Sequence, residues 1–218
     1  MRNLILVLLC LVFLNSYGQE VKTEFDGHKW EAPYDLPIPK DWTIERFLIP
    51  INFAPQISYK GVEDIRFTPG WAKEKSDEYW TYAFLWYLDG TPKTSAKIIS
   101  DNLKNYYAGL IASNTDSSKA RNETYIPVVT FFKKTQTFKD DIETYTGTIE
   151  MRDFLKRTPI TLNGIVHLKY CQEVKKTILF YELSPKPFTH NNWANLNQLW
   201  LDFKCKKILL PNKQRTVE

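Results

Sequence analysis

The segment Glu78–Leu88 places the strongest constraint on the fold. It contains neither glycine nor proline, and apolar residues occupy both sets of alternate positions. One set is Trp80, Tyr82, Phe84, Trp86 and Leu88, and the other is Tyr79, Thr81, Ala83, Leu85 and Tyr87. Successive side chains of a β-strand point to opposite faces of the sheet. Because this segment has apolar side chains to bury on each face, we predict that it is a central strand.

Alternation and turn residues predict the remaining elements. The expected strands are 42–51 at a sheet edge, 61–67, and four consecutive strands over 124–138, 142–154, 160–171 and 175–183. Short polar turns between the last four indicate an antiparallel meander. Helical spacing of apolar residues predicts one helix that Thr94 or Ser95 can cap and that runs to about Ile111, and another around Trp193–Phe203. We therefore predict an α+β fold, with an antiparallel sheet of about six or seven strands and two helices on one face.

The chain divides by composition into four segments. Residues 1–18 carry Arg2, then the apolar run Leu4–Leu14, then small residues, as in a cleaved signal peptide. Residues 19–57 are rich in proline and aromatic residues and are expected to form an extended arm on the domain. Residues 58–207 are the predicted single α+β domain, and residues 208–218 a tail. An apolar run of eleven residues is too short to span a bilayer, so no membrane anchor is expected after cleavage.

The charge balance excludes several classes of partner. The 29 basic and 25 acidic residues give a net charge of +4, which falls to +3 when Arg2 is removed with residues 1–18. That charge is too small for a nucleic-acid-binding protein. With 43% apolar and 15% aromatic residues, the composition is that of a folded domain rather than a disordered chain. We expect an exported protein, periplasmic or extracellular.

Export would place the cysteines in an oxidising compartment. Without residues 1–18 the chain keeps Cys171 and Cys205, and in an oxidising compartment such a pair predicts a disulfide. The loop closed by this bond would add roughly 3–4 kcal/mol to stability on the chain-entropy model. Two buried free thiols are the alternative.

The two halves of the chain, 41–112 and 122–205, show short matches. Ile49-Pro50-Ile51 corresponds to Ile126-Pro127-Val128, and the strand segment 84–87 to 178–181. A ββα-type duplication would place the halves about a pseudo-two-fold axis, whereas chance similarity between β-rich segments is the alternative.

Three segments of the sequence resemble a known group of proteins. Pro50–Pro55, Gly61–Trp71 and the aromatic strand Trp80–Trp86 resemble a group of exported bacterial proteins of unknown function, over about 40 residues. The resemblance implies no activity, cofactor or catalytic residue. It draws attention to the turn at Pro69-Gly70 and to the strand that follows.

The aromatic strand is the sharpest candidate for a binding surface. Trp80, Tyr82 and Trp86, together with Trp71 just before the strand, would form a stacking platform for an apolar or sugar-like ligand if they were exposed. The alternative is that these rings are core beneath the helices. Arg66 could bind a ligand anion, or form a salt bridge across strands.

Established catalytic templates are absent from the sequence. It has no phosphate-binding glycine loop, no paired-histidine zinc motif and no Gly-x-Ser-x-Gly, and His28, His167 and His190 lack metal-ligand spacing. We therefore predict no catalytic residue, metal or cofactor, and we interpret the histidines as structural or surface residues.

Four carboxylates flank the Pro69-Gly70 turn, namely Glu63, Asp64, Asp77 and Glu78. Two of them could serve as the acid and base of a glycosidase.

Taken together, the aromatic strand and the missing catalytic templates predict a non-catalytic binding module for an unknown partner protein or an apolar or sugar-like small ligand. The alternative is an envelope hydrolase that uses paired carboxylates.

Overall fold

The computed structural model describes residues 25–115 and 126–206. Its elements are β1 (Tyr34–Asp35), β2 (Thr43–Ile49), β3 (Gly61–Phe67), β4 (Tyr82–Asp89), α1 (Ala96–Ser113), β5 (Val129–Lys134), β6 (Glu143–Arg152), β7 (Pro159–Cys171), the 3₁₀ turn η2 (Gln172–Val174), β8 (Lys176–Ser184), α2 (Asn192–Asp202) and β9 (Lys204–Cys205). The predicted signal peptide and tail, and the first residues of the predicted strand 124–138, lie outside the described residues.

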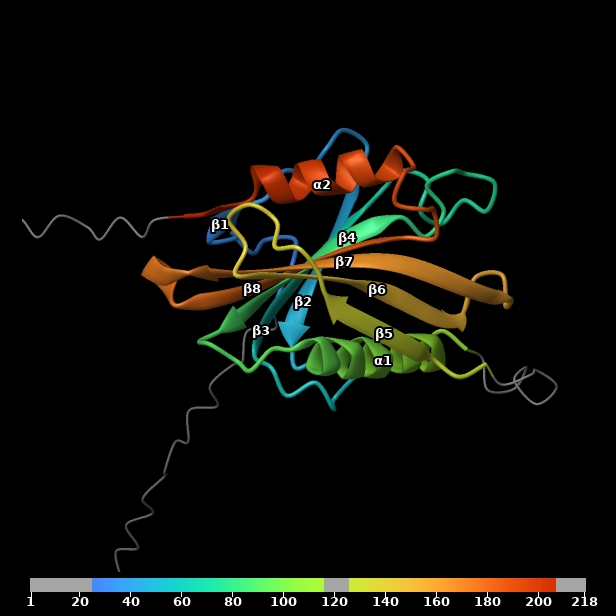
Figure 1. The fold of residues 1–218 in the computed structure, drawn as a ribbon, viewed down its shortest axis with the longest axis horizontal. Coiled ribbons are helices and arrows are strands. Elements are labelled where there is room, and N and C mark those ends of the chain that lie inside the picture. Colours follow the sequence, from blue (N-terminus) through green and yellow to red (C-terminus); the bar gives the residue numbers. More distant parts are fainter. Residues whose placement is uncertain (1–24, 116–125, 207–218) are drawn as a thin grey trace, which may run out of the picture.

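Seven strands form one antiparallel sheet in the order β2-β3-β4-β8-β7-β6-β5, and β1 pairs with β9 in a second, small sheet. The α+β class and the number of strands are confirmed, as are the edge position of β2 and the meander from β5 to β8. β4 lies at the centre of the sheet, as its two apolar faces predict (Figure 1). β2 falls within the segment 19–57, so part of the expected arm is a strand of the main sheet.

β4 begins at Tyr82, four residues later than the sequence predicts. The reason lies at Trp80, whose φ of 54° is in the left-handed region that interrupts extended backbone. The Trp80 N–H donates to the Trp71 carbonyl oxygen at 2.8 Å, which folds the chain between them back on itself. The loop therefore brings the rings of Trp71 and Trp80 beside the start of β4.

The prediction that both helices lie on one face is wrong. The buried residues of α1, such as Leu103 and Tyr106, pack with Phe84 and Trp86 of β4. The buried residues of α2 instead pack with Leu85 on the opposite face of the same strand. Figure 1 shows the sheet between the two helices. Because β4 and β8 are apolar on both faces, each face needs its own cover, and one helix supplies each.

The positions of the helices do not fit the pseudo-two-fold axis that a duplication would imply. β4 and β8 are adjacent and antiparallel. A two-fold axis that relates adjacent antiparallel strands is perpendicular to the sheet, so it leaves each face on its own side. Such an axis would place both helices on one face, whereas α1 and α2 lie on opposite faces.

A buried charge cluster holds the chain before β2 against the α2 face. Asp64 accepts a hydrogen bond from the Tyr34 hydroxyl at 2.7 Å and lies 3.1 Å from Arg46 Nε. Arg66 pairs with Asp64 through Nη1 and Nη2. Its remaining N–H groups donate to the carbonyl oxygens of Leu36, Pro37 and Ile65. The arm is thus fixed by charge-assisted hydrogen bonds as well as by its aromatic rings.

Cys171 and Cys205 form a disulfide, with their Cα atoms 5.7 Å apart. The bond joins the end of β7 to β9, where Cys205 pairs with Tyr34 of β1. It therefore closes a covalent loop that contains β8 and α2. It also anchors β9, the strand with which β1 of the arm pairs.

Replacing both cysteines with alanine is expected to lower the free energy of unfolding by roughly 3–4 kcal/mol, because the unfolded chain regains the freedom of a long loop. Urea denaturation of the double variant beside the oxidised protein measures this difference. The control is the same measurement on the double variant with and without reductant, which should agree. Equal stability of the oxidised protein and the variant would show that the bond does not stabilise this fold.

Candidate functional site

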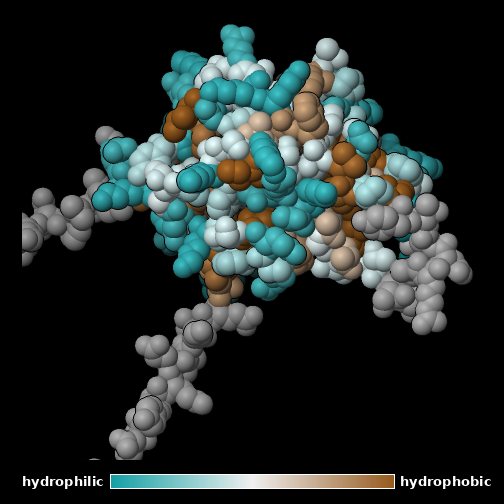
Figure 2. All heavy atoms as spheres, turned by 60° about the horizontal axis from the view of Figure 1, so that its bottom comes forward, coloured by the Kyte–Doolittle hydropathy of each residue, from teal (hydrophilic) through white to brown (hydrophobic). Residues whose placement is uncertain are grey.

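A partly enclosed cavity of about 270 Å³ lies on the α1 face and is here called the aromatic pocket. Its rings belong to Phe47, Phe53, Phe67, Trp71, Trp80, Tyr82, Tyr106 and Phe154, and Glu45, Ile65, Leu110 and Asn114 complete the lining. Figure 2 shows the side of the molecule that carries α1, where hydrophobic patches lie between hydrophilic residues. Larger grooves of about 700 and 600 Å³ lie along the arm, but they are shallow and open to solvent.

The pocket has a buried floor and half-buried walls. Trp80, Tyr82 and Tyr106 are 1%, 4% and 3% exposed and form the floor. Phe67 and Trp71 stack with their ring centroids 4.5 Å apart, and Phe154 meets Trp80 edge to face at 5.1 Å. Because the wall rings are only half buried, their free faces are available to a ligand.

The turn that carries Trp71 is held tightly. The Gly70 N–H donates to Glu78 Oε2 at 2.8 Å. A Cβ atom at Gly70 would lie 2.1 Å from Ser76 Oγ, so only glycine fits this approach. The left-handed conformation of Trp80 adds a local strain of about 1–2 kcal/mol. Such strained residues cluster at functional sites, which favours this loop as part of one.

A buried carboxyl group lies behind the pocket. Glu63 is fully buried and accepts hydrogen bonds from Trp86 Nε1 at 2.9 Å and from the Tyr106 hydroxyl at 2.7 Å. Burial raises the pKa of Glu63 to about 8, although both hydrogen bonds act to lower that pKa. The hydroxyls of Tyr82 and Tyr107 hydrogen-bond to each other. The tyrosines of the floor therefore direct their hydroxyls toward internal partners and offer ring surface to the pocket.

The structure brings together three of the five binding residues that the sequence suggested. Trp71, Trp80 and Tyr82 line the aromatic pocket. Trp86 is fully buried farther along β4, where it contacts Glu63, and Arg66 lies on the opposite face. All five guanidinium N–H groups of Arg66 donate to internal acceptors, so it has none left for a ligand anion.

An open stacking platform on β4 is ruled out by burial, because Trp80, Tyr82, Phe84 and Trp86 are each at most 4% exposed. The pocket walls come instead from rings that sequence reasoning missed, namely Phe47, Phe53, Phe67 and Phe154. Phe67 follows Ile65 at strand spacing and could have been assigned to the same face. The other three belong to segments that no local sequence pattern places near β4.

The four carboxylates of the glycosidase alternative do not meet in one cleft. Glu63 contacts Trp86 on the α1 face, whereas Asp64 faces the arm on the other side of β3. Asp77 forms a surface ion pair with Lys186 at 2.7 Å, and Glu78 accepts the Gly70 N–H. This set therefore provides no acid and base pair.

Within the described residues, neither a metal-binding cluster nor a membrane-spanning helix indicates a function, and no related protein does so either. Within residues 25–115 and 126–206, no group of three or more His, Cys, Asp or Glu side chains could hold a metal ion. No helix in the same ranges is long and apolar enough to cross a membrane. Comparison of the sequence and structure with protein-family models, curated proteins and solved structures gives no match. The function must therefore be inferred from the geometry of the sites.

Proposed function

We propose that this protein is an exported binding module whose aromatic pocket takes a small apolar ligand with a flat ring. The observation that carries the proposal is the convergence of half-buried rings from β2, β3, the Trp71 turn and the segment after β6 on the buried floor of the pocket. Pockets lined mainly by aromatic side chains, with few polar groups at the rim, are typical of small-ligand sites.

The lining favours an apolar ring over a sugar. A sugar needs hydrogen-bond partners for its hydroxyl groups, and the floor tyrosines direct theirs to Tyr107 and Glu63. Glu45 and Asn114 remain as polar groups of the lining. Export is supported by the Cys171–Cys205 bond, because disulfides persist in oxidising compartments.

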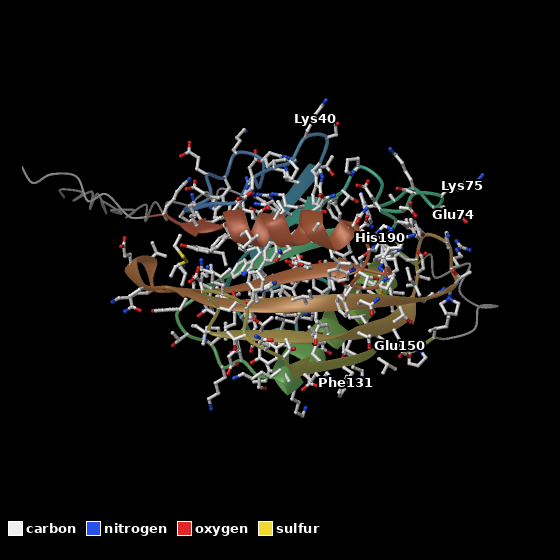
Figure 3. All side chains as sticks on the ribbon, turned by 45° about the horizontal axis from the view of Figure 1, so that its top comes forward. Lys40, Glu74, Lys75, Phe131, Glu150 and His190 are labelled. Atoms are coloured by element: carbon white, nitrogen blue, oxygen red, sulfur yellow. A yellow bond between two sulfur atoms is a disulfide. The ribbon has the colours of Figure 1, made fainter. Side chains whose placement is uncertain are left out.

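Titration with 2-naphthol, followed by tryptophan fluorescence, tests the proposal. We expect saturable binding that is about tenfold weaker in the Trp71→Ala variant, because the ligand loses a ring face in the pocket wall. The matched control is Phe131→Ala on β5, which removes a ring that is 63% exposed and lies outside the pocket (Figure 3). Trp71 is half buried, so its removal should leave the core folded.

Equal affinity of Trp71→Ala and the unchanged protein would contradict the assignment of the pocket. Binding of methyl β-glucopyranoside in place of 2-naphthol would show that the ligand is a sugar. Failure of both probes would leave no small ligand of either class, and would favour a partner protein at this surface.

A further inference from the structure

A second cluster of chemically active side chains lies on the other face of the sheet, beneath α2. His167 of β7 is 2% exposed and stands between two carboxylates. Its Nδ1 lies 2.7 Å from Asp141 Oδ2, and its Nε2 lies 3.3 Å from Glu182 Oε1. The sequence analysis interprets His167 as a structural or surface histidine, because the histidines lack metal-ligand spacing.

The two carboxylates have different surroundings. Asp141 has three partners, since it also accepts hydrogen bonds from Thr144 Oγ1 at 2.5 Å and from Trp200 Nε1 at 2.9 Å. It therefore orients the histidine and ties α2 to the sheet. Glu182 is fully buried, yet neither of its oxygens accepts a hydrogen bond of normal geometry from the described residues, and the same holds for His167 Nε2. Buried polar atoms without such partners are rare in folded proteins and call for an explanation.

Glu182 and His167 lie at the floor of a groove of about 420 Å³ between α2 and the segment that joins β5 to β6. Trp193 and Asn197 line it from α2, and Phe138 and Thr146 line it from the other side. In Figure 1 the joining segment, drawn in yellow, runs across the sheet toward α2. The groove thus combines ring surface and neutral polar groups with one unused carboxylate, a composition typical of ligand sites.

The charge of the cluster selects the ligand. When both carboxylates are ionised, the cluster carries one net negative charge with His167 protonated and two with His167 neutral. Burial acts to lower the pKa of His167, but the hydrogen bond with Asp141, the close contact with Glu182 and the charges of both carboxylates raise that pKa overall. The local field therefore favours positive charge despite the loss of solvent.

We propose that this groove binds a primary ammonium group, with Glu182 as its acceptor and the Trp193 ring beside its apolar chain. A cation placed there supplies the hydrogen bonds that Glu182 lacks and compensates its buried charge. The floor is almost closed, with the Glu182 side chain 1% exposed, so a compact ammonium fits better than a planar guanidinium. Aromatic rings add favourable contact with cations. Since Asp141 is committed to three donors, the cluster offers one acceptor rather than an acid and base pair.

Binding should also depend on pH. The charged groups that face His167 are Asp141 from the segment before β6 and Glu182 from β8, while Lys169 of β7 lies 4.7 Å from the Trp200 ring. The charged residue of α2 is Asp202 at its C-terminal end. A proton on His167 and an ammonium group compete for the same negative field, so affinity should rise as the pH rises through the titration of His167.

Isothermal titration of the full chain with n-butylammonium chloride, n-butanol and guanidinium chloride tests the proposal, together with NMR of the His167 ring. We expect saturable binding of n-butylammonium, about tenfold or more weaker in Glu182→Gln, and a lower pKa of His167 in the bound state. Burial raises the pKa of Glu182, so a neutral glutamine should be tolerated there. Glu150→Gln on β6 removes an exposed carboxylate and is the matched control (Figure 3).

Equal binding of n-butanol would overturn the proposal, as would unchanged affinity in Glu182→Gln. Absence of saturable binding would do the same and would leave the groove to water. Stronger binding of guanidinium would refute the assigned cation. The groove lies on the opposite face from the aromatic pocket, so these outcomes are independent of those with 2-naphthol.

Discussion

Replacing Glu63 with glutamine is expected to remove a large contribution to the pH dependence of folding stability. Burial raises the pKa of Glu63 from its ordinary value of 4.5 to about 8. The folded state therefore binds the proton more tightly than the unfolded chain does. Its stabilising effect is complete below about pH 4.5 and is lost as the pH rises through 8.

The size of the effect follows from the difference between these two pKa values. At 1.36 kcal/mol for each tenfold change in proton affinity, the protein should lose about 4 kcal/mol of stability between pH 5 and pH 9 from this group. Glutamine has nearly the same shape and cannot ionise. Its oxygen can accept the Trp86 N–H and its amide can donate to the Tyr106 hydroxyl, so both contacts of the carboxyl group are replaced.

Urea denaturation of the unchanged protein and Glu63→Gln, at intervals from pH 5 to pH 9, measures the effect. The variant should become the more stable of the two as the pH rises. Glu150→Gln, which changes an exposed carboxylate, is the control and should follow the unchanged protein. His167 and Glu182 titrate in both proteins, so their contributions cancel in the comparison. Parallel stability curves for Glu63→Gln and the unchanged protein would show that Glu63 ionises normally.

Replacing Arg66 with methionine is expected to lower the free energy of unfolding by about 4 kcal/mol, because it removes one partner of a buried ion pair. Asp64 would keep Arg46 and the Tyr34 hydroxyl as partners but lose both hydrogen bonds from Arg66. The carbonyl oxygens of Leu36 and Pro37 would lose their donors as well. The arm should therefore detach more readily than the sheet unfolds.

Two measurements separate these effects. Urea denaturation gives the global loss, and limited proteolysis reports cleavage within residues 25–42, where we expect faster cutting in Arg66→Met. Lys40→Met changes an exposed lysine of the same arm and should leave both measurements unchanged (Figure 3). If Arg66→Met cleaves no faster than Lys40→Met, the arm is held by its aromatic contacts alone.

Local sequence patterns predicted most of the strands because the alternation of side chains between the two faces can be recognised within each strand segment. β3 matches its predicted bounds, and of the two predicted caps, Thr94 and Ser95, Ser95 caps α1 by accepting the Ile98 N–H at 3.2 Å. The error at the start of β4 has a local cause, because Trp80 adopts a left-handed conformation that favours glycine and that nothing in its residue type announces.

The sites were less accessible to sequence reasoning because their parts come from distant segments. Trp71 and Trp80 were identified, but the walls provided by Phe47, Phe53 and Phe154 depend on how loops and strands approach β4. The cluster around His167 could not be found at all, since Asp141 and Glu182 reach it from a loop and a neighbouring strand.

The sequence by itself determined the class of the fold and the central place of β4, because alternation is a property of the chain, and it made Cys171 and Cys205 candidates for a disulfide that the structure then showed. Tertiary structure alone decided which face each helix covers, which rings stay half buried around the aromatic pocket, and which carboxylate is left without a hydrogen bond. These outcomes depend on contacts between residues far apart in sequence, which the local pattern of neither partner specifies.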